Sequence, residues 1–97
     1  MSNPDADAPE LAFLGELEVR AQRLDLAEDA FRKSLANASP EDVESGAFTR
    51  TMLARLLIQK KPAEARDLLN AARNAYEQLG DTVSIADIDR LLRVLAL

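Results

Sequence analysis

Apolar residues recur along the chain at helical rather than strand spacing, and turn signals divide the pattern into five segments. Asp7 and Glu10 form a capping-box pattern with Pro9 in the first turn, so a helix is expected to begin there. Residues 1–7, which precede this helix, are expected to be disordered. Its apolar stripe, spaced by three or four positions, is Leu11, Leu14, Leu17, Ala21 and Leu24.

The second and third segments show similar start signals. Asp25 and Glu28 repeat the capping box, and the second helix is expected to end near Asn37. Its expected inner face is Ala27, Ala30, Phe31, Ser34, Leu35 and Ala38. Ser39 followed by Pro40 is expected to open the third helix. The apolar positions of that helix are Val43, Ala47, Phe48, Met52, Leu53, Leu56, Leu57 and Ile58.

The fourth and fifth segments have the clearest ends. The fourth helix is predicted over residues 62–79, because Pro62 suits a first turn and Gly80 suits a C-terminal stop. Its stripe is Ala65, Leu68, Leu69, Ala72, Tyr76 and Leu79. Asp81 or Ser84 is expected to cap the fifth helix, over residues 82–97. The buried face expected for it is Ile85, Ile88, Leu91, Leu92 and Leu95.

Composition agrees with an all-α fold. The chain has 97 residues, of which 47% are hydrophobic and only 4% aromatic, with three glycines. Such a length is enough for one domain with a modest core, expected over residues 8–97. The connections between the predicted helices are short, so sequential helices are expected to pack antiparallel.

The net charge and the absence of two residue types argue against several classes of function. A net charge of −5 argues against nucleic-acid binding, which needs an excess of Lys and Arg. The absence of Cys and His removes thiolate and imidazole chemistry and the usual zinc ligands. We therefore expect no catalysis, no cofactor and no metal site. The N-terminal MSNPDADAPE has no basic and apolar regions of a signal peptide, and no apolar run could span a bilayer, so a cytoplasmic location is expected.

Two helix pairs share an internal plan. At an offset of 38 residues Ala27 corresponds to Ala65, and at an offset of 39 Gly15 corresponds to Ala54. Small residues therefore fall on small residues in both pairs. A larger side chain at these places would hold two backbones apart, so the pattern predicts that paired helices cross closely there.

These residues resemble the tetratricopeptide repeat family. Leu14-Gly15 followed by Ala27, Phe31 and Ser34 is similar to its pattern, as is, more loosely, Leu53-Ala54 followed by Ala65, Leu69 and Ala72. The resemblance covers about residues 8–96 as two and a half divergent repeats. It implies five antiparallel helices stacked as helical hairpins, closed by a C-terminal capping helix.

The resemblance also implies a protein-interaction module that binds a peptide or helix of another protein on the concave face of its first and third helices. The residues expected on that face are Ala12, Glu16, Val19, Arg20, Arg23, Phe48, Thr51, Arg55, Ile58 and Gln59. The alternative is a homo-oligomerisation unit, such as a dimer, that self-associates through its terminal helices, because several apolar residues are hard to bury in one copy. They are Phe13, Met52, Val83, Val94, Leu95, Ala96 and Leu97.

Overall fold

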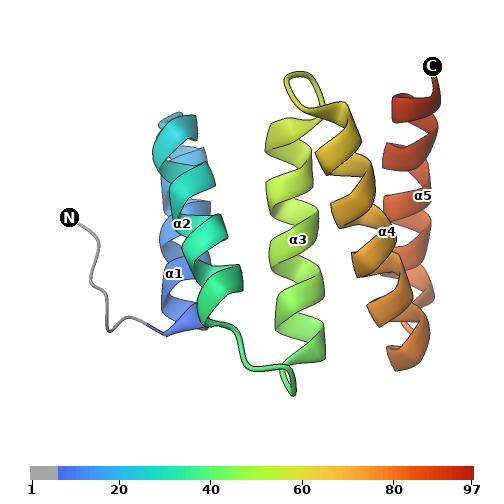
Figure 1. Ribbon diagram of the computed structural model, residues 1–97, viewed down its shortest axis with the longest axis horizontal. Helices are drawn as coiled ribbons and strands as arrows, with labels where there is room; N and C mark the ends of the chain where they lie inside the picture. Colours follow the sequence, from blue (N-terminus) through green and yellow to red (C-terminus); the bar gives the residue numbers. More distant parts are fainter. Residues whose placement is uncertain (1–6) are drawn as a thin grey trace. The chain divides into compact units, whose positions relative to one another are not determined.

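The computed structural model describes residues 7–97, which form five α-helices and contain no β-strand (Figure 1). The all-α prediction is confirmed. The helices are α1 (Ala8–Arg20), α2 (Leu24–Asn37), α3 (Val43–Leu57), α4 (Pro62–Leu79) and α5 (Thr82–Ala96). They fall into two compact units: unit 1 ends at Asp42 and unit 2 comprises Val43–Leu97. The disorder expected for residues 1–7 concerns mainly residues 1–6, which lie outside the described part of the chain, and the single domain over residues 8–97 stays a prediction.

Unit 1 is a hairpin of α1 and α2, which lie side by side (Figure 1). Asp7 caps α1 as predicted, because its carboxylate accepts a hydrogen bond of 2.9 Å from the backbone N–H of Glu10. The prediction of a second capping box, formed by Asp25 and Glu28, was wrong. The helix α2 begins at Leu24, one residue before Asp25, and its N-cap Arg23 makes no side-chain capping bond. The end of α2 at Asn37 is as predicted.

The buried side of α1 differs from the predicted leucine stripe. Leu14 and Leu17 remain 40% and 41% exposed, whereas the buried residues of the helix are Ala8, Leu11, Gly15 and Glu18. The reason is that α2 packs on the side of α1 that carries Gly15, about 100° around the helix from Leu14. Only a residue without a side chain leaves room for the bulky Phe31 of α2.

The inner face of α2 is confirmed at its four central positions. Ala27, Ala30, Phe31 and Ser34 are all buried. The Ser34 hydroxyl donates a buried hydrogen bond of 2.7 Å to the backbone carbonyl of Ala8 at the start of α1. Small side chains therefore let the two helices approach closely, and one of them also ties their ends together.

In unit 2, α4 packs against both α3 and α5 (Figure 1). The predicted bounds of α4 are confirmed, and Gly80 ends it in the left-handed conformation, with φ of 70°. Asp81 rather than Ser84 caps α5, accepting hydrogen bonds from the backbone N–H and the hydroxyl of Ser84 at 3.0 and 2.7 Å.

The bounds of α3 are shorter than predicted at both ends. Ser39 and Pro40 do not open the helix, because the Ser39 hydroxyl accepts a bond from the Glu41 N–H in a turn that precedes α3. The helix begins at Val43 and ends at Leu57, so Ile58 lies in the following turn.

The core of unit 2 consists of residues that are at most 1% exposed, together with the nearly buried Tyr76. The former are Ala47, Leu53, Ala54, Leu57, Ala65, Leu69, Ala72 and Ile88. The burial of Ala54 and Ala65 agrees with a close crossing of α3 and α4. On α5 only Ile88 is buried, and the four other residues of its predicted face are half-buried. Among residues 7–97, no helix is both long enough and apolar enough to cross a membrane.

Candidate protein-binding surfaces

A hollow of about 210 Å³ opens among the three helices of unit 2. Its lining comes from α3 (Phe48, Thr51, Met52, Arg55), α4 (Tyr76) and α5 (Ser84, Asp87, Ile88). Phe48, Thr51 and Arg55 are residues that the sequence predicted on a binding face. The structure therefore brings three of the predicted residues together around one concavity, called the unit 2 pocket below.

The unit 2 pocket combines apolar and polar groups. Ile88 is fully buried, whereas Phe48 is 40% exposed and Arg55 is exposed. Burial raises the pKa of the Tyr76 hydroxyl above its usual value. The Thr51 hydroxyl donates a bond of 2.9 Å to the carbonyl of Ala47 in its own helix. The pocket thus combines hydrocarbon with a cation, Arg55, and an anion, Asp87.

The other predicted residues do not line the unit 2 pocket. Ile58 is half-buried and Gln59 exposed, both in the turn after α3. The five predicted residues of unit 1 lie on α1 or just after it: Ala12, Glu16 and Val19 are half-buried, and Arg20 and Arg23 are exposed. The concave face expected to join residues of both groups stays a prediction.

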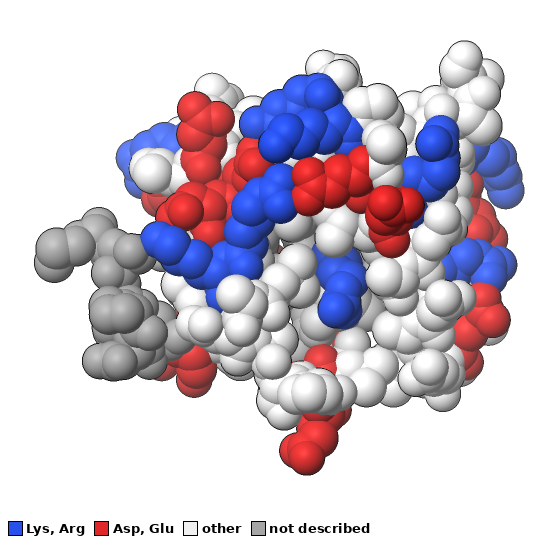
Figure 2. Space-filling view, in the orientation of Figure 1, with Lys and Arg blue, Asp and Glu red and all other residues white. Residues whose placement is uncertain are grey.

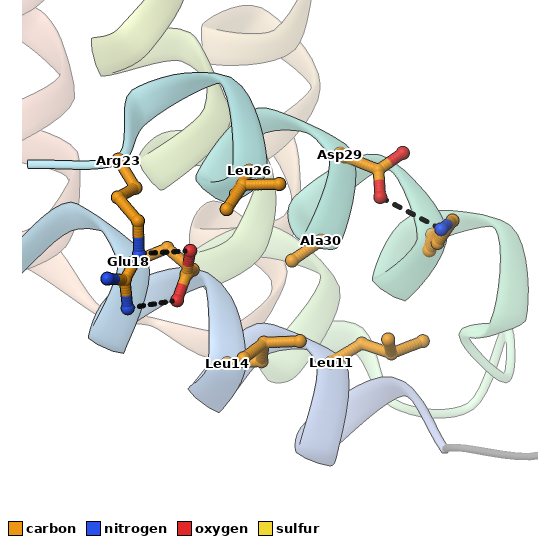
Figure 3. A pocket seen from close by; sticks show the side chains of 8 residues that line it. Leu11, Leu14, Glu18, Arg23, Leu26, Asp29 and Ala30 are labelled. Carbon is orange, nitrogen blue, oxygen red and sulfur yellow. Dashed lines mark hydrogen bonds and ion pairs between the residues drawn. The ribbon is translucent and has the colours of Figure 1, made fainter. Parts of the chain in front are cut away.

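A second hollow, of about 280 Å³, lies between α1 and α2 in unit 1 (Figure 3). Leu11 and Leu14 of α1 and Leu26 and Ala30 of α2 form its apolar part. Two ion pairs also line this hollow. Glu18 of α1 pairs with Arg23, and Asp29 pairs with Lys33 within α2. Of the predicted binding residues, only Arg23 lines this second hollow, which is called the unit 1 groove below.

The pair of Glu18 and Arg23 was not predicted from the sequence. Glu18 is only 8% exposed, and the Arg23 guanidinium donates it two hydrogen bonds, of 3.0 and 3.1 Å. These bonds hold the pKa of the Glu18 carboxyl below its usual value. Arg23 follows the end of α1 by three residues, and this spacing is the only signal the sequence offers.

Elsewhere the charged side chains are distributed rather than gathered. On the face in Figure 2, acidic and basic side chains are interspersed with uncharged ones. Several pair within or between helices, as Arg73 of α4 does with Asp89 of α5 at 2.8 Å. Within residues 7–97, no three acidic side chains lie close enough together to hold a metal ion.

Comparison of the chain with models of protein families, with curated proteins and with solved structures finds no match in any of the three.

Proposed function

We propose that this protein is a non-catalytic interaction module that binds a segment of another protein at the unit 2 pocket. The observation that supports the proposal is that Phe48, Thr51 and Arg55, predicted for a binding face from the sequence, line one hollow with residues of α4 and α5. The proposal includes a tetratricopeptide-like stacking of the helices, with binding on the side of α1 and α3, and a cytoplasmic location. It includes no cofactor and no nucleic acid.

The size and chemistry of the pocket define the expected ligand. A volume of about 210 Å³ is below the roughly 300 to 1,000 Å³ typical of small-molecule sites, so side chains of a peptide fit it better than a whole metabolite. Phe48 and Ile88 favour a large apolar side chain. Arg55, exposed beside them, favours a carboxylate next to that side chain, since a guanidinium can bind it with two hydrogen bonds.

A peptide-display selection on the intact protein tests this function. We expect the selected peptides to carry a large apolar residue next to Asp or Glu. Arg55→Glu should weaken their binding by about tenfold or more, because it replaces attraction with repulsion. Arg93→Glu is the matched control, since Arg93 is exposed on α5 and does not line the pocket. Selected peptides that bind Arg55→Glu as tightly as the original protein would contradict the proposal.

Exposed apolar side chains favour the alternative function, a homo-oligomerisation unit. Phe13 is 60% exposed, Val83 74%, Val94 53% and Leu97 fully exposed, whereas Met52 and Leu95, which the sequence also suggested were hard to bury, are half-buried. The exposed ones among them lie on or at the end of α1 and α5, the terminal helices. Large apolar side chains in water mark surfaces that another protein surface can cover.

A further inference from the structure

The outward side of α1 carries an apolar stripe with an acid at one end and a base at the other. Phe13, Leu14 and Leu17 are 60%, 40% and 41% exposed, and they lie between the exposed Glu10 and Arg20. At 3.6 residues per turn these five side chains fall within about 120° of the helix circumference. Glu10, Phe13, Leu17 and Arg20 lie on the side of α1 away from its contact with α2 around Gly15, and Leu14 lies at the edge of the hollow between the two helices.

The surface extends onto α2. Leu26, which is 54% exposed, lines the unit 1 groove together with Leu14, and Figure 3 shows the two side chains on the same side of the hairpin. The apolar area is therefore contributed by both helices, although the charged ends are on α1. We call this surface, formed by Glu10, Phe13, Leu14, Leu17, Arg20 and Leu26, the α1 stripe.

The α1 stripe is complementary to a second copy of itself that runs in the opposite direction. If a second α1 lies antiparallel with its residue 15 level with residue 15 of the first, Glu10 of each copy lies level with Arg20 of the other. In the same register Phe13 lies level with Leu17, and Leu14 lies close to the twofold axis. A twofold interface requires that each contact occur twice with the roles exchanged, and this register meets that requirement for charged and apolar residues together.

We infer that two copies of this chain associate through antiparallel packing of their α1 stripes. The inference rests on the oligomerisation alternative given above and assigns it a surface and a register. The apolar residues supply affinity by leaving water. The charges select the orientation, because a parallel arrangement would place Glu10 against Glu10 and Arg20 against Arg20.

Sedimentation velocity of the full chain over about 1 to 300 μM gives the first test. We expect the original protein to pass from the monomer mass of 10.6 kDa to twice that mass as its concentration rises. Leu17→Glu should remain monomeric throughout, because it places two charges in the apolar centre. The matched control is Leu79→Glu, the same substitution at an exposed leucine of α4, which should dimerise like the original.

A charge exchange tests the register. Glu10→Arg and Arg20→Glu should each weaken dimerisation by about tenfold, because each creates two contacts between like charges. The double variant restores both pairs with reversed polarity, so we expect near-original dimerisation. Circular dichroism of each variant is the folding control. An unchanged helical spectrum shows that the variant is still folded when it no longer dimerises.

Two results would overturn the inference: a protein that stays monomeric at every concentration, or a dimer that Leu17→Glu leaves intact. A double variant no better than the single ones would overturn the antiparallel register. Peptide binding at the unit 2 pocket is measured separately on Leu17→Glu, whose substitution lies outside that pocket. The inference and the peptide-binding function can therefore fail independently.

Discussion

Gly15 of α1 lies directly against the ring of Phe31 of α2. A β-carbon on Gly15 would lie 2.5 Å from Cε1 and 2.7 Å from Cδ1 of that ring, closer than carbon atoms approach in proteins. Phe31 is fully buried, so its ring is enclosed by other atoms of the protein. The contact between the helices of unit 1 therefore depends on a residue without a side chain at position 15.

Gly15→Ala is expected to destabilise the protein by about 1 to 3 kcal/mol, the usual cost of overpacking a filled core. At an open helical position the same change would stabilise by about 1 kcal/mol, because Ala has the higher helix propensity. The sign of the effect thus tests the contact. Urea unfolding followed by circular dichroism measures it, and a stabilised variant would show that the ring does not cover Gly15.

Phe31→Leu, combined with Gly15→Ala, separates overpacking from other effects. The smaller side chain leaves space for the added methyl group, so the double variant should lose less stability than the sum of the two single losses. The expected difference is at least about 0.5 kcal/mol, as for residues in direct contact. Additive losses would mean that the two residues do not share one site.

The helix ends that the sequence predicted well are those specified by single residues. Pro62 has a fixed φ that suits a first turn, and Gly80 readily adopts the left-handed conformation that ends α4. Asp7 caps α1 with its own side chain. Such signals act within a few residues, so they are visible without knowledge of packing. The α2 start was missed because the acidic residues after Leu24 resemble a cap without providing one.

The orientation of α1 could not be predicted from its pattern. A stripe containing Leu14 and Leu17 has the helical spacing of a core face, yet the structure buries Gly15 and Glu18 instead. Which side of a helix is buried depends on the shape of its neighbour, here on where Phe31 enters. Glu18 was unexpected because burial of a carboxylate requires a partner, and Arg23 becomes one only through the fold of the turn.

Only part of the candidate binding site was predicted from the sequence, because the rest of it also depends on how neighbouring helices pack. The resemblance to the tetratricopeptide repeat family implied that Phe48, Thr51 and Arg55 lie on one binding face, and their helical spacing agrees with one side of α3. Tyr76 on α4 and Asp87 on α5 join them only because the three helices converge. Nothing in the sequence relates these two positions to α3, so the unit 2 pocket could not be foreseen as a whole.

Ser34→Ala is expected to destabilise the protein by about 1 kcal/mol. The substitution removes the buried hydrogen bond to the Ala8 carbonyl and leaves that oxygen without its side-chain donor. Unfolding in urea measures the change, and faster hydrogen exchange in the first turns of α1 would locate it. Ser39→Ala is the control, because Ser39 is exposed in the turn after α2 and its change should have little effect. Equal effects would show that the Ser34 bond contributes nothing.

Leucine in place of a small residue at the helix crossings should be harmful in both units. Ala27 in unit 1 and Ala65 in unit 2 are fully buried, so Ala27→Leu and Ala65→Leu should each cost about 1 to 3 kcal/mol or more. The controls are Ala36→Leu and Ala71→Leu, the same change at exposed positions of α2 and α4, where little loss is expected. Thermal melts would compare them, and equal losses at buried and exposed positions would refute the assigned faces.

The ion pair of Glu18 and Arg23 should make stability depend on pH in the acidic range. Because hydrogen bonds from Arg23 lower the pKa of Glu18 in the folded protein, folding favours the charged carboxylate. The stabilisation is therefore complete above the unfolded pKa of about 4.3 and is lost as the pH falls through the lower folded pKa.

Glu18→Gln should be less stable than the original at pH 7, and this difference should shrink towards pH 3. In an Arg23→Gln background the same substitution should give no such pH-dependent difference, because the donor that lowers the pKa is gone. A stability difference that stays constant from pH 7 to pH 3 in the original background would show that the pair does not form in solution.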